Sequence, residues 1–191
     1  MIEAGVDEAG RGCLAGPVVA AAVILPRRFR HPVLNDSKQL TARQRREIRE
    51  EIVAKAVSWH VSFVPATEID EMNILRATWK AMHEALSHLN PRPEFIIVDG
   101  NRFLQYEKIP FRAIVRGDAL YFSIAAASVL AKTARDEYMA EIHDEFPQYG
   151  WNRNMGYPTA EHRRAIESYG ITPYHRRSFS LFNRQLSLPF L

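Results

Sequence analysis

The chain has 191 residues, of which 47% are hydrophobic and 25% are charged, a size and composition typical of one globular domain. Its 25 Lys and Arg against 22 Asp and Glu give a formal net charge of only +3, so charge alone is weak support for an anionic partner. The single cysteine, Cys13, excludes an intrachain disulfide and a cysteine-based metal site. The start does not resemble a signal peptide and no stretch reaches about 18 apolar residues, so we expect a cytoplasmic protein without membrane contact.

Strand and helix patterns alternate along the chain. Residues 2–7 and 18–25 are rich in Val, Ile and Ala and are joined by a glycine-punctuated loop, so they predict two strands. Thr41 and Gln44 form a capping-box signature before a helix that ends near Lys55. We expect further strands at residues 57–64, 95–98 and 111–115, and helices at 67–89 with a break near Asn73, at 118–146, and from Thr159. The order predicts an α/β domain with a mixed sheet.

Four acidic residues lie at the ends of these predicted strands. Asp7 and Glu8 lie where the first strand meets the glycine loop, Asp99 follows the apolar strand at 95–98, and Asp118 follows the strand at 111–115. Because adjacent residues on a strand point to opposite faces, Asp7 and Glu8 can serve one site only if the pleat ends there. Any one of these acids is explained as a cap or turn residue. As a set they predict a functional site at the carboxyl ends of the strands.

An all-oxygen cluster of this kind suits Mg²⁺ or Mn²⁺. Two such ions about 3.5 to 4 Å apart can activate a water and stabilise the leaving oxygen of an in-line displacement, so phosphodiester hydrolysis is the natural reaction. Asp136 competes with Asp118 for the fourth position. The two acids are about 27 Å apart if one helix joins them, at 1.5 Å per residue. We therefore assign Asp118 to the site and expect Asp136 to form a structural ion pair.

Five motifs occur in the same order as the signatures of the ribonuclease HII (type 2 ribonuclease H) family, which the chain resembles: residues 5–12 (GVDEAGRG), 36–40 (DSKQL), 98–100 (VDG), 117–118 (GD) and 124–136 (IAAASVLAKTARD). The resemblance implies a ribonuclease H-like fold, in which helices flank a five-stranded mixed sheet and a C-terminal helical extension follows. On this basis we divide the chain into a catalytic core (1–146), an extension that completes the substrate groove (147–182) and a tail (183–191).

The resemblance also implies an activity. Members of this family are endonucleases that hydrolyse the RNA strand of RNA/DNA hybrids and cut 5′ to ribonucleotides embedded in duplex DNA, in ribonucleotide and primer removal. They use Mn²⁺ or Mg²⁺ and leave 5′-phosphate and 3′-hydroxyl ends. We expect a monomer that acts in this way. The metal-binding catalytic residues that the resemblance implies are Asp7, Glu8, Asp99 and Asp118.

Substrate-binding residues follow from the same resemblance. Gly10, Arg11 and Gly12 match the family's loop that reads the ribose 2′-hydroxyl at an RNA-to-DNA junction, a role that suits glycine because the backbone can approach a sugar closely. Arg11 can add a phosphate contact. Tyr157 matches the tyrosine that packs on the sugar beyond the junction, with an ordinary buried tyrosine as the alternative.

Two further matches and two departures complete the comparison with the family pattern. Ser37 and Lys38 correspond to residues along the substrate groove. Cys13 stands where the family usually has Pro, and we expect it to be a small apolar loop residue. Met155 stands where the family usually has Lys, which puts one phosphate contact in doubt, and Arg153 is a candidate to replace it.

Other polar residues leave alternatives open. Two groups of arginines are explained equally well by phosphate contacts or by solvated surface charge. The lone histidines His162 and His175 are more often structural than catalytic in such positions, so we assign them no role. The arginines are Arg43, Arg45 and Arg46 in the first group, and Arg163, Arg164, Arg176 and Arg177 in the second.

The C-terminal residues resemble the short peptide by which bacterial replication proteins bind the sliding clamp. A glutamine and spaced apolar anchors suit an apolar cleft, although the same residues can equally pack back onto the domain. The anchors are Gln185, Leu186, Leu188 and Phe190.

Two competing functions remain. One is a catalytically silent adaptor that binds hybrids or is recruited by the clamp. Clustered acids argue against it, because a binder gains nothing from negative charge near phosphates. The other is a DNA-cutting nuclease on the same fold, against which the 10–12 loop and Tyr157 argue.

Overall fold

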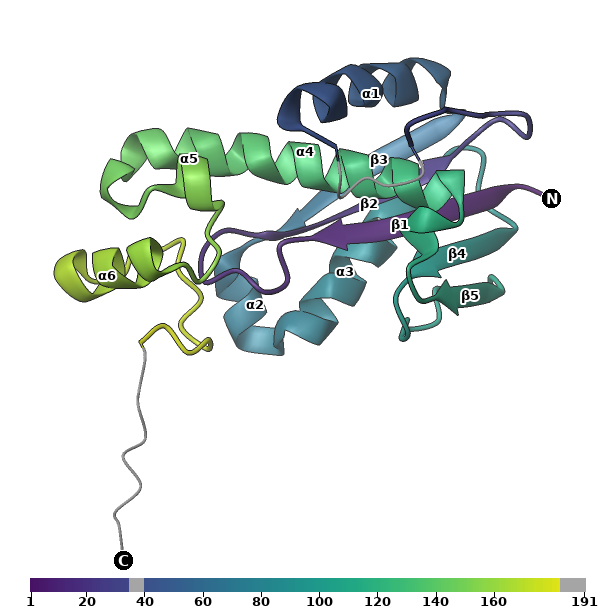
Figure 1. Cartoon of the computed structure of the whole chain (residues 1–191). Coiled ribbons are helices and arrows are strands. Elements are labelled where there is room, and N and C mark those ends of the chain that lie inside the picture. Colours follow the sequence, from purple (N-terminus) through teal and green to yellow (C-terminus); the bar gives the residue numbers. More distant parts are fainter. Residues whose placement is uncertain (35–39, 183–191) are drawn as a thin grey trace, which may run out of the picture.

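A five-stranded mixed sheet forms the centre of the computed structural model, which describes residues 1–34 and 40–182 (Figure 1). The strand order is β3-β2-β1-β4-β5, with β1 antiparallel to β2, β2 antiparallel to β3, and the β1–β4 and β4–β5 pairs parallel. The mixed sheet predicted from the sequence is therefore confirmed. The strands are β1 (Glu3–Ala9), β2 (Val18–Ile24), β3 (Ser58–Val64), β4 (Phe95–Asp99) and β5 (Phe111–Ile114).

Helices cover both faces of this sheet. α1 and α4 pack on one face, α2 and α3 pack on the other, and α5 and α6 lie at one end of the molecule (Figure 1). In the described part of the chain, none of the helices is both long and apolar enough to cross a membrane. The helices are α1 (Ala42–Lys55), α2 (Ala66–Met72), α3 (Ile74–Ser87), α4 (Phe122–Glu145), α5 (Trp151–Asn154) and α6 (Ala160–Tyr169).

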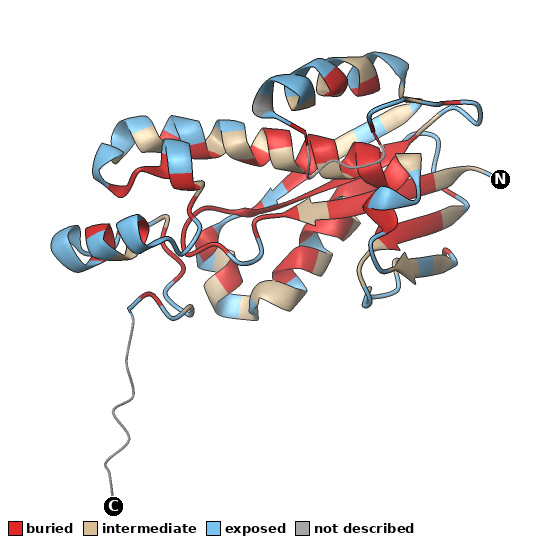
Figure 2. Ribbon diagram, in the orientation of Figure 1, coloured by how far each residue is buried: buried red, intermediate tan, exposed pale blue. Residues whose placement is uncertain are grey.

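The strand β2 is buried over its whole length, between the two helical layers (Figure 2). Its alternate residues divide between the layers: Ala20 and Ala22 belong to the core with α3, and Val19 and Ala21 belong to the core with α4. Small residues also bring α4 close to β1. A Cβ atom added to Gly5 would lie 2.2 Å from the backbone carbon of Ser123, so α4 lies directly on the backbone of β1.

The local signals read from the sequence set most of the element boundaries. Thr41 and Gln44 form the predicted capping box at the start of α1. Asn73 ends α2 with a positive φ of 70°, and its side chain accepts hydrogen bonds from the first amides of α3. Two expectations were wrong. β1 continues through Ala9, and α4 begins at Phe122 because a 3₁₀ turn, Gly117–Ala119, intervenes.

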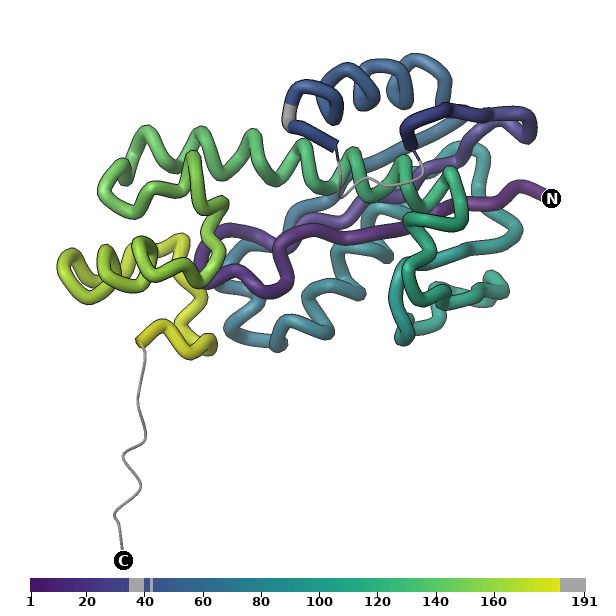
Figure 3. The backbone as a smooth tube through the Cα atoms, in the orientation of Figure 1, coloured from purple at the N-terminus to yellow at the C-terminus, as the bar shows by residue number. Residues whose placement is uncertain are grey.

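The C-terminal segments bind the loop between β1 and β2. The Leu14 amide donates to the Gly156 carbonyl (2.7 Å), the Gly16 amide donates to the Tyr174 carbonyl (2.9 Å), and the Arg176 amide donates to the Leu14 carbonyl (2.8 Å). Figure 3 shows this purple loop running in among the yellow-green C-terminal segments. The C-terminal segments therefore pack against the core rather than forming an independent unit.

We predict that Gly5→Ala lowers the free energy of unfolding by about 1–3 kcal/mol, because the added methyl group overlaps the backbone of α4. Urea denaturation measures the loss. Gly12→Ala is the matched control, since a Cβ there has nothing within 4 Å. Equal stability of the two variants would contradict the close packing of α4 on β1.

Candidate active site

The site lies where β1 and β4 separate. Their parallel pairing runs as far as Val6 and Val98, whereas the pairing of β1 with β2 continues through Asp7 and Glu8. We expected the strand itself to end at these acids, and that was wrong. The pairing with β4 ends instead, so this edge of β1 has no strand partner next to Asp99, the last residue of β4.

Asp7 is almost completely enclosed. Its side chain is on the α4 face of the sheet, is 5% exposed, and accepts hydrogen bonds from the Glu8 amide (2.7 Å) and from the Ser128 hydroxyl on α4. Burial raises the pKa of Asp7 well above its usual value, and the negative charges of Glu8 and Asp99 raise it further. Asp7 is therefore a carboxylate whose ionised form would be stabilised by a nearby cation.

Glu8 shares this environment from the next position of the strand. Burial raises its pKa, and repulsion from Asp99 adds to the shift, although Arg11 opposes it through an ion pair of 3.2 Å. The second carboxylate oxygen, Oε2, is buried and has no hydrogen-bond partner among the described residues. Such an oxygen is costly to bury without a ligand.

Asp99 connects the strand ends to the segment that carries Asp118. Its Oδ1 accepts the Gly117 amide at 2.7 Å, so the residue before Asp118 is fastened to the end of β4. Asp118 is 5% exposed and lies in the 3₁₀ turn that follows Arg116, which has a left-handed φ of 58°. The structure thus brings Asp7, Glu8 and Asp99 together and places the backbone before Asp118 beside them.

The donors in this cluster fit a hard divalent cation. They are all carboxylate oxygens, and Glu8 Oε2 has no partner among the described residues. Burial and the charge of neighbouring acids oppose the ionisation of Asp7 and Glu8. Within residues 1–34 and 40–182, no group of three or more His, Cys, Asp or Glu side chains is arranged so that it could hold a metal ion by itself. An open site of a few carboxylates suits Mg²⁺ or Mn²⁺, which complete their shells with water and phosphate oxygens.

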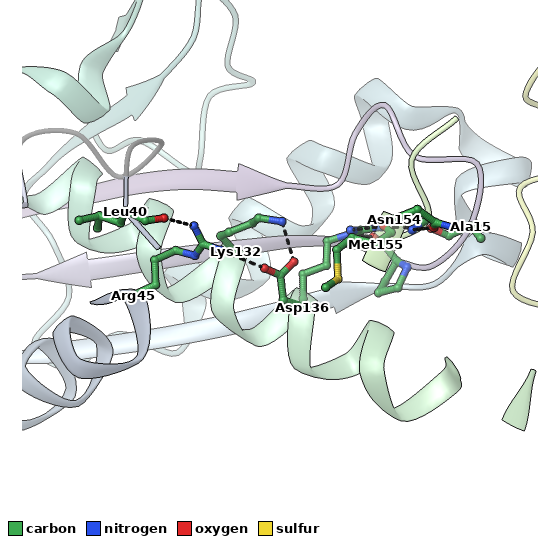
Figure 4. Close-up of polar contacts among 10 residues, drawn as sticks. Ala15, Leu40, Arg45, Lys132, Asp136, Asn154 and Met155 are labelled. Atoms are coloured by element: carbon green, nitrogen blue, oxygen red, sulfur yellow. Dashed lines mark hydrogen bonds and ion pairs between the residues drawn. The ribbon is translucent and has the colours of Figure 1, made fainter. Parts of the chain in front are cut away.

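Asp136 belongs to a different contact. It pairs with Lys132 (2.6 Å) one turn away and with Arg45 of α1 (3.6 Å), and Arg45 also donates to the Leu40 carbonyl (Figure 4). The predicted structural ion pair of Asp136 is confirmed.

Tyr157 lies on the surface beside the loop at residues 10–16. It is 41% exposed, so the alternative of a buried tyrosine is wrong. Its ring lies 5.8 Å from the Lys132 ammonium and 6.0 Å from the Arg135 guanidinium, and its hydroxyl donates to the sulfur of Cys13. This ring is therefore held against α4 with one face available to a ligand.

A buried histidine pair supports the Tyr157 segment. His162 Nδ1 is 2.9 Å from the Tyr157 carbonyl and must donate to it, so His162 Nε2 accepts from the Trp151 indole (3.0 Å). His175 Nδ1 accepts the Thr172 amide (2.9 Å). Both histidines are thus neutral, and burial lowers the pKa of His175 to about 4. The structural role expected of them is confirmed.

The remaining predicted residues have different outcomes. Arg11 and Gly12 are exposed. Cys13 is fully buried, as expected for a small apolar residue, and burial raises the pKa of its thiol. Arg153 forms an ion pair with Glu161 on the surface, and its replacement of the missing lysine stays a prediction. Six predicted residues lie outside the described residues: Ser37, Lys38, Gln185, Leu186, Leu188 and Phe190.

Sequence reasoning missed several residues that hold the site. Ser128 and Arg135 are seven residues apart on α4, so they share one face of this helix, and that spacing was a usable signal. Arg163 donates to the Ser180 and Leu181 carbonyls (2.8 Å each). Arg176 is completely buried. Neither of the two explanations given for the arginine groups, phosphate contacts or solvated surface charge, anticipated this.

Comparisons with known proteins identify the family. The family model described as Ribonuclease HII matches residues 4–182. The chain belongs to the ribonuclease HII family. It is 56% identical over 191 residues to "Ribonuclease HII" of Bacteroides thetaiotaomicron, covering 100% of this chain and 96% of that protein. It is 58% identical to "Ribonuclease HII" of Christiangramia forsetii, covering 98% of this chain and 94% of that protein. Like the family, the chain is an endoribonuclease that acts on RNA in RNA/DNA hybrids.

Solved structures agree with the ribonuclease H-like fold. The ribonuclease H2 of Pyrococcus horikoshii OT3 has a TM-score of 0.80 at 29% identity, covering 95% of both chains. The ribonuclease HII of Archaeoglobus fulgidus, solved in a complex with PCNA, has a TM-score of 0.82 at 27% identity, covering 97% of this chain and 98% of that one. Bst-RNase HIII in complex with Mn²⁺ shares the fold at a TM-score of 0.73 and 18% identity, covering 95% of this chain and 68% of that one.

We predict that Asp7→Asn stabilises the metal-free protein at neutral pH. Because the pKa of Asp7 is raised in the folded state, its ionised form opposes folding, and this opposition fades as the pH falls through the raised pKa. In urea denaturation with a chelator, the free energy of unfolding of the variant should exceed that of the parent most near about pH 8. The difference should shrink towards about pH 4.

Asp70→Asn is the control, for which we expect the opposite change in stability. Burial tends to raise the pKa of Asp70, but hydrogen bonds from Ser178 and Arg177 outweigh it and lower that pKa. This variant should therefore lose stability at neutral pH. An Asp7→Asn variant that is less stable than the parent at every pH would contradict the electrostatic account.

Proposed function

We propose that the chain cuts 5′ to ribonucleotides embedded in duplex DNA and within the RNA strand of hybrids, by hydrolysis that depends on two divalent metal ions and leaves 5′-phosphate and 3′-hydroxyl ends. The observation that carries this proposal is the group of three acids where β1 and β4 separate: Asp7 is buried, Glu8 and Asp99 are partly buried, and their charges raise the pKa of Asp7. A nucleic-acid binder without catalysis would be weakened by such charge next to phosphates.

Each acid has a proposed part. Asp7, Glu8, Asp99 and Asp118 would hold Mg²⁺ or Mn²⁺, and the bound pair would supply activation of water and stabilisation of the leaving oxygen. The Mn²⁺ complex of Bst-RNase HIII, which has the same fold, supports a divalent ion of this class. Ser128 orients Asp7 through its hydroxyl, and the Gly117 amide orients Asp99.

Substrate recognition would come from the surface beside these acids. The exposed backbone of Arg11 and Gly12 can approach a ribose closely, and the 2′-hydroxyl is the group that distinguishes RNA from DNA. The exposed ring of Tyr157 offers a flat surface for the next sugar. We assign the core to residues 1–146, the groove-completing extension to 147–182 and a separate tail to 183–191.

We predict that Asp99→Asn abolishes cleavage while the fold is retained. Loss of groups that merely support metal ligands costs about 10- to 100-fold in activity, so removing a ligand should cost at least that much. The assay compares a duplex with one ribonucleotide, a full hybrid and plain DNA, each with Mg²⁺, Mn²⁺ or chelator. Glu94→Gln, an exposed acid paired with the N-terminus, is the control. Full activity of Asp99→Asn, or cleavage with chelator present, would refute the metal site, and cleavage of plain DNA would favour the alternative nuclease.

The C-terminal residues suggest a second interaction. We propose that Gln185, Leu186, Leu188 and Phe190 bind the replication sliding clamp, which the complex of the Archaeoglobus fulgidus relative with PCNA supports.

Deletion of residues 185–191 should remove clamp binding and leave hydrolysis of a short hybrid unchanged, because the acids lie in the core. Surface plasmon resonance on immobilised clamp measures the binding, and a turnover assay measures the hydrolysis. Scrambling the order of residues 185–191 is the matched control and should also lose binding. A deletion variant that binds the clamp as tightly as the parent would refute this role for the tail.

A further inference from the structure

Two arginines are completely buried beneath the loop that joins β1 to β2. Arg135, on α4, and Arg176, in the C-terminal extension, are both 0% exposed. Arginine is almost never fully buried unless a carboxylate pairs with it. Yet neither guanidinium forms an ion pair with any acidic side chain in the described ranges.

In the described part of the chain, the guanidinium of Arg176 donates only to main-chain carbonyls of this loop. Its Nη2 donates to Gly10 (2.7 Å), its Nη1 donates to Arg11 (2.9 Å), and its Nε donates to Gly16 (3.0 Å). The guanidinium therefore occupies the inside of the loop, and its planar fork fixes three carbonyls that would otherwise be free to rotate. The loop depends for its shape on one side chain that is far away in the sequence.

Arg135 connects the same loop to the segment that carries Tyr157. Its Nε donates to Pro17 (3.0 Å), its Nη2 donates to Ala15 (3.1 Å), and its Nη1 donates to the Met155 carbonyl (2.9 Å). Ala15 and Met155 lie close together at this point in Figure 4. The guanidinium thus fixes the distance between the loop and the residues just before Tyr157.

These buried charges are expensive. Burial, together with the charge of the neighbouring Arg135, lowers the pKa of Arg176 to about 10, so the side chain remains protonated at neutral pH. Two cations buried in contact with backbone carbonyls cost free energy that a packed apolar core would not. A loop that only joined two strands would gain nothing from them.

The two arginines determine which way the peptide groups of the loop point. Because the carbonyls of Gly10 and Arg11 turn inward to Arg176, the opposite edge of their peptide groups faces outward, and Arg11 and Gly12 are exposed. Among the described residues, the Gly12 amide takes part in none of the backbone hydrogen bonds of the loop. An outward amide is a donor for an oxygen of a bound sugar or phosphate.

We infer that Arg176 and Arg135 are positioning residues for ribose recognition: Arg176 turns the amides of the loop towards the substrate, and Arg135 fixes the spacing between that loop and Tyr157. The inference rests on the proposed function. It adds that the selectivity for ribose over deoxyribose depends on two side chains that cannot touch the substrate.

The test is Arg176→Lys, which keeps a positive charge but cannot reproduce three forked bonds. Binding is measured with chelator present, so that nothing is cleaved, on a duplex with one ribonucleotide and on the same duplex of DNA alone. Arg163→Lys is the matched control, because Arg163 also donates to two carbonyls but at Ser180 and Leu181, away from the loop. Thermal melting verifies the fold of each variant.

We expect Arg176→Lys to reduce the preference for the ribonucleotide duplex by about tenfold or more, as for loss of charge-assisted hydrogen bonds, with a raised KM and a smaller change in kcat. Arg163→Lys should keep the preference. Arg135→Lys is the second variant, used if Arg176→Lys does not fold, and should show the same selective loss. A folded Arg176→Lys or Arg135→Lys variant with the parent's preference would overturn the inference. A parent protein without any preference would instead refute the proposed function.

Discussion

The separation of β4 from β1 beyond Val6 is the constraint on which the site depends. Up to that point β1 is paired on both sides and buried between two helical layers. Beyond it, β1 keeps only its antiparallel partner β2 among the described strands, and Asp7 and Glu8 lie in this part of β1. Carboxylates in that position lose solvent and repel one another. The energetic cost of this arrangement is the strongest sign that a cation belongs there.

The close packing of α4 against β1 fixes the positions of the residues around Asp7. Gly5 allows the backbone of α4 to lie directly on β1, and the same close approach brings the Ser128 hydroxyl to Asp7. Residues further along the same helix lie around the site. Lys132 lies near the ring of Tyr157, and Arg135 lies beneath the loop that joins β1 to β2. A single long helix therefore positions both the acids and the loop and tyrosine for which we propose a role in substrate recognition.

The C-terminal extension also holds the loop between β1 and β2 in place. Its main chain bonds to the loop at Leu14 and Gly16, and Arg176 fills the inside of that loop. The neutral histidine pair holds the carbonyl of Tyr157 from within the extension. Core and extension thus share one hydrogen-bonded interface at the loop, where Arg176 and Arg11, 165 positions apart in the sequence, are joined directly.

The sequence by itself determined the order and type of the main elements, the capping box at Thr41 and the break at Asn73, because these follow from short-range patterns. Its motifs also predicted the four acids as one set. It did not determine that Asp118 lies in a 3₁₀ turn before α4, or that Arg176 is buried. Both depend on contacts between distant segments. An arginine looks the same in sequence whether it meets water, phosphate or a carbonyl, and only the tertiary structure decides which of these surrounds it.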